Sequence, residues 1–306
     1  MDARVVTVGD RAVALRDAGD PHGSPLLYFH GTPGSRLDVS FGDEASRALG
    51  VRVISFDRPG YGRSDPGPYD LRSVVRDAAA VADRLGVGRF AVFGWSGGGP
   101  FALAAAAELG ERVTRVGVAG TVAPPREMPG AMDAFTDGDR AALALLPAQP
   151  DRAAEQFRAS NREMLDLLLS VRDDTDAYWI DLMWGESDPE VVADPTSRTV
   201  LRTLVDEGLR QGPMGICWDN VAWCGPWGFR LDEVRRPVHL WHGELDQMVA
   251  PANGHWLRDH LPRAELSMVP GEGHLVPVRH WRSILRTLVH APERSVPARA
   301  IVRPGE

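Results

Sequence analysis

One serine of this sequence lies in a setting that could make it a nucleophile. Ser96 is the centre of GWSGG (residues 94–98), a G-x-S-x-G motif that follows the apolar run 90–93 and precedes a helix-like segment beginning at Pro100. A serine on a sharp strand-to-helix turn presents its hydroxyl at the edge of a sheet, and flanking glycines let neighbouring segments approach. We therefore expect Ser96 to attack a carbonyl carbon, with Trp95 beside it as a candidate substrate contact.

A serine hydroxyl is a poor nucleophile until a base accepts its proton and a third group orients that base. His274 follows the apolar run 264–269. Asp246 follows the run 238–241. Imidazole, with a free pKa of about 6.5, accepts and returns a proton near neutral pH. Because the C-terminal ends of parallel strands meet at one edge of a sheet, we expect Ser96, Asp246 and His274 to form a catalytic triad in the chain order typical of one hydrolase fold.

Other histidines and acids are weaker candidates for the two supporting roles. His242 precedes Asp246 in the same loop, and Glu244 of that loop is the main rival of Asp246. Asp219 and Asp232 do not follow an expected strand. Structural or solvated roles are favoured for the histidines that lie in an early turn, inside an expected strand or on or beside expected helices: His22, His239, His255, His260, His280 and His290.

The negative charge that develops on a carbonyl oxygen during such an attack is stabilised by N–H donors. Gly97, the residue after the nucleophile, supplies one backbone amide in this kind of site. The second should come from the loop HGTPG (residues 30–34), which follows the apolar run 26–29. We expect it to be the amide of Thr32, because Pro33 has no N–H to donate.

These residues require a sheet to position them. Short runs rich in Val, Leu and Phe alternate with longer segments of helical period, which predicts an α/β fold whose mostly parallel sheet has helices on both faces. An eight-stranded sheet is expected, with an antiparallel hairpin in front, from these runs: 4–8, 12–16, 26–29, 51–56, 90–93, 113–119, 238–241 and 264–269. Residues 71–85 repeat apolar side chains at the spacing of one buried helix face.

The alternation is interrupted between residues 122 and 230, where helical segments such as 153–171 and 198–209 follow each other without a strand. We interpret 122–230 as a helical cap over one edge of the sheet. The core is then 1–121 together with 231–290, and 291–306 is a loose tail. Several tryptophans in the cap either contact an apolar or planar substrate or only pack the cap onto the core: Trp179, Trp184, Trp218, Trp223 and Trp227.

Composition excludes several classes of function. All 34 basic residues are arginine, which removes lysine Schiff-base chemistry and the phosphate-binding P-loop lysine. A net charge of -8 argues against a nucleic-acid partner. Cys217 and Cys224 have no second Cys or His pair at metal spacing, so neither metal nor other cofactor is expected. With no signal peptide or long apolar run, we expect a cytoplasmic monomer or homodimer that acts on a small molecule without a membrane partner.

Five motifs together resemble the α/β-hydrolase superfamily over nearly the whole chain, and most closely its bacterial esterase-like members with helical caps: HGTPG (30–34), DRPGYGRSD (57–65), GWSGGGPFALA (94–104), HGELDQMVAP (242–251) and GEGHLVP (271–277). The resemblance implies the same triad and the same oxyanion donors, and structural roles for Asp57 and Arg58.

The resemblance also implies a reaction class. Members that open epoxides or remove halides carry aspartate at the elbow, so Ser96 favours acyl transfer. We expect hydrolysis of a carboxylic ester, thioester or lactone of a small apolar or aromatic molecule through an acyl-enzyme. Two alternatives stay open. One is a non-hydrolytic protein of this fold, such as a lyase, cofactor-free oxygenase, tailoring cyclase or ligand receptor. The other is an aminopeptidase like the proline iminopeptidases, with Glu186 and Asp188 holding the substrate amine.

Overall fold

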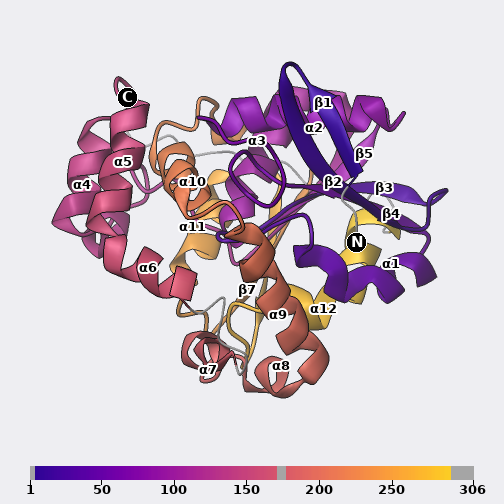
Figure 1. Ribbon diagram of the computed structural model, residues 1–306. Helices are drawn as coiled ribbons and strands as arrows, with labels where there is room; N and C mark the ends of the chain where they lie inside the picture. The colour runs from indigo at the N-terminus through magenta and orange to yellow at the C-terminus, as the bar shows by residue number, and fades with distance from the viewer. Residues whose placement is uncertain (1–3, 171–176, 291–306) are drawn as a thin grey trace.

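The structure is a computed structural model that describes residues 4–170 and 177–290. An eight-stranded sheet runs through the molecule in the order β1-β2-β4-β3-β5-β6-β7-β8 (Figure 1). β2 pairs antiparallel with β1 and β4, and every other neighbouring pair is parallel. The strands are β1 (Arg4–Val8), β2 (Arg11–Gly19), β3 (Ser24–Phe29), β4 (Val51–Phe56), β5 (Phe90–Trp95), β6 (Val113–Ala119), β7 (Val238–Gly243) and β8 (Ala264–Val269).

The mostly parallel sheet and the N-terminal hairpin are therefore confirmed, with differences at several strand ends. β5 continues two residues past the expected end at 93, because its pairing with β6 extends to Trp95 opposite Ala119. All six side chains of β5 are buried, as in a strand covered on both faces. Trp95 therefore belongs to the strand, and Ser96 is the first residue beyond it.

Helices cover both faces of the sheet. Alternate side chains of a strand point to opposite faces, and on β3 the ring of Tyr28 meets Trp281 of α12 (Val276–Leu285) whereas Phe29 stacks on Phe101 of α3 (Gly99–Leu109). α1 (Asp43–Ala48) packs on the α12 face and α2 (Leu71–Arg84) beside α3. α11 (Ala252–His260) packs on β7 and β8.

Between β6 and β7 the described residues form helices and no strand, as expected. We call residues 137–224 the helical insertion. Figure 1 shows its first helices on the side of the molecule away from β1 and β2. The α-helices of the whole insertion are α4 (Asp137–Ala144), α5 (Pro150–Ser160), α6 (Arg162–Ser170), α7 (Tyr178–Trp184), α8 (Pro189–Ala193), α9 (Pro195–Gly208) and α10 (Met214–Cys224).

The insertion differs from its expected form in one place. The segment expected as one helix over 153–171 is two helices that meet at Asn161, whose side-chain amide donates to Phe157 O at the end of α5. Val171 and the expected tail 291–306 lie outside the described residues, and the expected boundaries at 122 and 230 stay predictions. None of the helices in the described parts of the chain is long and apolar enough to cross a membrane.

Candidate active site

Ser96 lies at the turn between β5 and α3 with a φ of 54°, a left-handed conformation that is rare for residues with a side chain. The glycines around it permit this turn. A Cβ on Gly94 would lie 2.4 Å from Gly98 O, and one on Gly98 would lie 2.2 Å from Phe29 O. Because nothing larger than glycine fits at either position, the motif packs directly on β3 and holds the serine at the C-terminal edge of the sheet.

His274 and Asp246 are in direct contact. His274 lies in the loop between β8 and α12, and its Nδ1 is 2.8 Å from Asp246 Oδ2 in the loop after β7. Both side chains are buried. The indole Nε1 of Trp95 donates to the backbone oxygen of His274 at 3.1 Å. The last residue of β5, next to Ser96, therefore also holds the loop that carries His274, which we call the histidine loop.

Asp246 is ionised and fully hydrogen-bonded. Its Oδ1 accepts the amides of Met248 and Val249 at 2.9 Å each, and His242 Nε2 lies 3.4 Å from its Oδ2. Burial alone would raise the pKa of Asp246, but His242, His274 and the Val249 amide outweigh it and hold this pKa well below its ordinary value. An ionised carboxylate accepts only, so His274 Nδ1 carries the proton and Nε2 is left free to accept one.

The rival candidates for these two roles lie elsewhere. Glu244 is exposed. His242 is buried, and its Nε2 hydrogen-bonds the backbone oxygen of Val249 at 2.7 Å, which fixes the loop on which Asp246 stands. Asp219 belongs to α10 and contacts other residues than the histidine. Asp232 pairs with Arg230 at the surface.

Ser96 and His274 line one cavity of about 50 Å³. In the described part of the chain no hydrogen bond joins the hydroxyl of Ser96 to the imidazole, a bond that in many hydrolases tightens only when substrate is present. Trp95 lines the same cavity, as do apolar side chains of the insertion and the β7 loop: Leu168, Met183, Trp184, Leu204, Val205 and Met248. The site is therefore small and largely apolar.

The two expected oxyanion donors lie against each other. A Cβ on Gly97 would lie 2.3 Å from Thr32 Oγ1 and 3.7 Å from Thr32 N, so the threonine packs directly on the glycine that follows Ser96. Among the described residues, none accepts a hydrogen bond from the Thr32 amide. The neighbouring Gly31 amide donates to Asp38 Oδ2 at 2.9 Å, and the Ser35 amide donates to Asp38 Oδ1 at 2.7 Å. Asp38 thus fixes the loop and leaves the Thr32 amide available.

A buried carboxylate of the insertion holds the histidine loop. Asp188 accepts the backbone amides of Gly273 at 3.0 Å, His274 at 2.9 Å and Leu275 at 3.3 Å. The sequence suggested this residue only as a binder of a substrate amine, but both of its oxygens are occupied by the backbone. Its position before α8 gave no signal for this role, because the three backbone amides that it accepts lie 85 or more residues away in the chain.

Neither cysteine is placed for catalysis. Cys217 and Cys224 are free, buried thiols of α10. Burial raises the pKa of Cys217 to about 11, which keeps it protonated and unreactive at neutral pH. Within residues 4–170 and 177–290 there is no group of three or more His, Cys, Asp or Glu side chains that could hold a metal ion.

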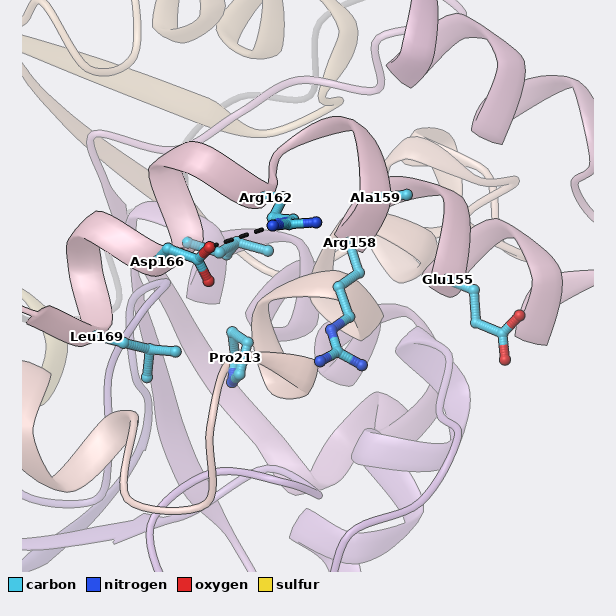
Figure 2. Close-up of a pocket in the computed structure, with 8 residues that line it drawn as sticks. Glu155, Arg158, Ala159, Arg162, Asp166, Leu169 and Pro213 are labelled. Carbon is cyan, nitrogen blue, oxygen red and sulfur yellow. Dashed lines mark ion pairs between the residues drawn. The ribbon is translucent and has the colours of Figure 1, made fainter.

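A second, larger hollow of about 510 Å³ is lined by residues of α5, α6 and Pro213 (Figure 2). Leu165 and Leu169 line it, whereas Leu168 of the same helix lines the cavity at Ser96. Figure 2 shows Arg162 paired with Asp166 along α6, and the two side-chain atoms are 3.6 Å apart. The expected site residues do not line this hollow. Because neighbouring residues of α6 line the two spaces, α6 lies between this hollow and the cavity at Ser96.

The contacts of Asp188 lead to a prediction about stability. Asp188→Ala would leave three buried amides without their acceptor, and we expect the free energy of unfolding to fall by about 1 to 3 kcal/mol for these losses. Glu190→Gln is the matched control, because this nearby acid forms only an exposed pair with Arg279. Urea denaturation measures both variants, and an equal, small effect of the two would contradict the role of Asp188.

The buried carboxyl of Asp38 predicts a pH dependence. Burial raises its pKa to about 7, although the Ser35 and Gly31 amides oppose the rise. Between about pH 4 and pH 7 the folded state therefore holds a proton that the unfolded state has released, so stability from this group falls as pH rises, by about 1.4 kcal/mol per unit of pKa difference. We expect the free energy of unfolding of Asp38→Asn to fall less across this window than that of the wild type. Parallel urea-derived profiles for the two proteins would contradict this.

Comparison with known proteins agrees with the fold. A family model described as "alpha/beta hydrolase fold" matches residues 24–280. The pimeloyl-[acyl-carrier protein] methyl ester esterase of Nitrosomonas europaea is 28% identical over 259 residues, which span 83% of this chain and 89% of that protein. A proline iminopeptidase of Xanthomonas citri is 37% identical over 109 residues, about a third of each chain. The solved structure of an esterase from Exiguobacterium antarcticum superposes with a TM-score of 0.70 at 18% identity, covering 94% of this chain and 98% of that one.

Proposed function

The chain belongs to the α/β-hydrolase fold family, and we propose that it is a serine hydrolase that cleaves a carboxylic ester, thioester or lactone through an acyl-enzyme on Ser96. The observation that carries the proposal is the cavity that Ser96 shares with His274, whose Nδ1 is held by the ionised Asp246. That arrangement provides a nucleophile, a base and the group that orients the base.

In the first half of the reaction, Ser96 Oγ attacks the carbonyl carbon while His274 Nε2 takes the hydroxyl proton. The carbonyl oxygen becomes an anion that accepts hydrogen bonds from the amides of Thr32 and Gly97. When this intermediate collapses, the bond to the alcohol or thiol breaks and His274 gives its proton to the leaving group. The product of this half is an ester between the acyl group and Ser96.

In the second half, His274 Nε2 takes a proton from water as the water oxygen attacks the acyl carbon. The same two amides bind the new oxyanion. The bond to Ser96 Oγ then breaks, His274 returns the proton to it, and the carboxylic acid leaves. Asp246 stays ionised throughout and stabilises the imidazolium that forms in each half.

The walls of the cavity favour a substrate with a small apolar acyl group. Its lining is apolar apart from the catalytic groups and the buried Asp38, and its volume is about 50 Å³. Apolar pockets gain binding free energy from the apolar area they remove from water. Trp95 presents an aromatic surface beside the nucleophile, which supports its proposed role as a substrate contact.

An aminopeptidase activity has one observation in its favour, the local similarity to a proline iminopeptidase. The carboxylates that would hold the substrate amine argue against it. Asp188 is committed to three backbone amides of the histidine loop, and Glu186 is exposed and does not line the cavity. Hydrolysis of an ester therefore remains the better supported reaction.

Replacement of the nucleophile tests the proposal. We expect Ser96→Ala to lower kcat for p-nitrophenyl acetate by at least about a thousandfold, because triad members act as a unit. Ser283→Ala, an exposed serine of α12, is the matched control and should keep wild-type turnover. A fluorophosphonate probe should label Ser96 in the wild type, located by mass spectrometry of peptides.

Other outcomes identify the alternatives. Activity that survives Ser96→Ala but is lost in His274→Ala would contradict the acyl-enzyme and favour proton abstraction, as in a lyase or cofactor-free oxygenase. Ligand affinity without turnover across an ester panel would favour a receptor.

The wall formed by α6 predicts the acyl preference. Leu168→Ala removes apolar side-chain volume from the cavity, so we expect the best p-nitrophenyl ester to become longer, for example butyrate or hexanoate instead of acetate. Leu169→Ala is the matched control, because Leu169 lines the second, larger hollow and not the cavity at Ser96. The measurement is kcat/KM across esters of increasing chain length. The same shift in both variants, or in neither, would show that Leu168 does not set the limit.

A further inference from the structure

The helical insertion also contributes a buried carboxylate to the loop that carries Thr32. Asp219 of α10 has no exposed surface. It accepts two hydrogen bonds from Arg58, to Oδ1 at 2.8 Å and to Oδ2 at 2.6 Å. It also accepts the hydroxyls of Tyr61 at 2.6 Å, Tyr69 at 2.8 Å and Thr32 at 2.5 Å. Five donors therefore converge on one side chain, far more than a surface acid attracts.

Arg58 carries this interaction to the backbone of the loop. Its Nη1 donates to His30 O at 2.7 Å, and its Nη2 donates to Gly31 O at 2.9 Å. The guanidinium is also buried, and although burial would lower the pKa of Arg58, the charge of Asp219 holds it above its ordinary value. The ion pair of Arg58 and Asp219 thus holds the backbone of residues 30–32 in place.

The geometry of a peptide group converts this support into an orientation. In a trans peptide the C=O and the following N–H point in opposite directions. The carbonyl of Gly31 is held on Arg58, so the N–H of Thr32 must point away from Arg58. The hydroxyl of Thr32, held by Asp219 Oδ2, fixes the side chain of the same residue against Gly97.

We propose that Asp219 is a positioning residue that, through Arg58 and the Thr32 hydroxyl, aims the Thr32 amide at the oxyanion formed on the substrate. The inference rests on the proposed function, since it gives the amide an oxyanion to bind. It makes the insertion part of the catalytic support, because the residue that orients a donor of the core stands on a helix of the insertion.

Removal of Asp219 itself would leave the charge of Arg58 buried without a partner, which by itself destabilises the fold. The sharper variant is therefore Thr32→Val, which keeps the shape of the side chain and the backbone amide but loses the hydroxyl bond to Asp219. Tyr69→Phe is the matched control, because it also removes one hydroxyl from Asp219, at Oδ1, without touching the loop. Thr32→Ser is the rescue variant, because it keeps the hydroxyl.

We expect Thr32→Val to lower kcat for p-nitrophenyl acetate by about tenfold with KM nearly unchanged, since misplaced donors weaken the transition state more than the ground state. Thr32→Ser should recover most of kcat. Affinity for a trifluoromethyl ketone, which forms an oxyanion on the serine, should fall in parallel with kcat. Tyr69→Phe should lower the melting temperature as Thr32→Val does, yet leave kcat within about twofold.

Unchanged kcat in Thr32→Val would overturn the inference, and so would an equal loss of kcat in Tyr69→Phe. Fluorophosphonate labelling of the same preparations distinguishes a failure of this inference from a failure of the proposed function. If the probe labels Ser96, the wild-type protein hydrolyses the ester and Thr32→Val has the same kcat, only the inference fails. If Ser96 is not labelled in the wild type, the proposed function fails.

Discussion

A buried carboxylate is unfavourable unless its oxygens are hydrogen-bonded, and this constraint organises the site. Asp38, Asp188, Asp219 and Asp246 are all buried. Each satisfies its oxygens with donors from loops at the C-terminal edge of the sheet: Asp38 with the loop after β3, Asp246 with its own loop and His274, Asp188 with the histidine loop, and Asp219 with Arg58 and Thr32. Because each carboxylate needs those donors, each also fixes them.

This constraint explains how irregular loops could acquire the precision that the proposed reaction requires. The sheet brings Ser96, Asp246 and His274 to one edge, but a strand controls direction only up to its last hydrogen-bonded residue. Beyond it the backbone amides of a loop need other acceptors. Here carboxylates supply them. An amide such as that of Thr32, which has no partner among the residues that the structure describes, is then positioned by its bonded neighbours. Preorganised donors of this kind require no rearrangement when charge develops on a substrate.

The sequence predicted what local pattern and chain order encode. The elbow at Ser96, the strands that precede Asp246 and His274, and the run of helices between β6 and β7 all follow from short motifs and periodicity. The roles of the supporting carboxylates could not be predicted in this way, because the residues they contact are remote in the chain. Asp188 is 86 residues from His274, and Asp219 is 187 residues from Thr32. A single aspartate on an insertion helix looks the same whether it faces solvent or a buried arginine. The break at Asn161 was missed for a related reason, since the apolar period continues across it.

The insertion serves two separable purposes. Side chains of α6, α7 and α9 form the apolar wall of the cavity, whereas the residue before α8 and the middle of α10 supply the carboxylates that hold core loops. Under the proposed function, a change of volume on the wall would alter which acyl group fits without removing an acceptor from any loop amide. A change at Asp188 removes the acceptor of three loop amides, and a change at Asp219 removes the acceptor of Arg58 and of the Thr32 hydroxyl, whatever the substrate. Substrate preference can therefore diverge along α6, α7 and α9 while the geometry of Thr32 and His274 is retained, because the two tasks rest on different residues of the same segment.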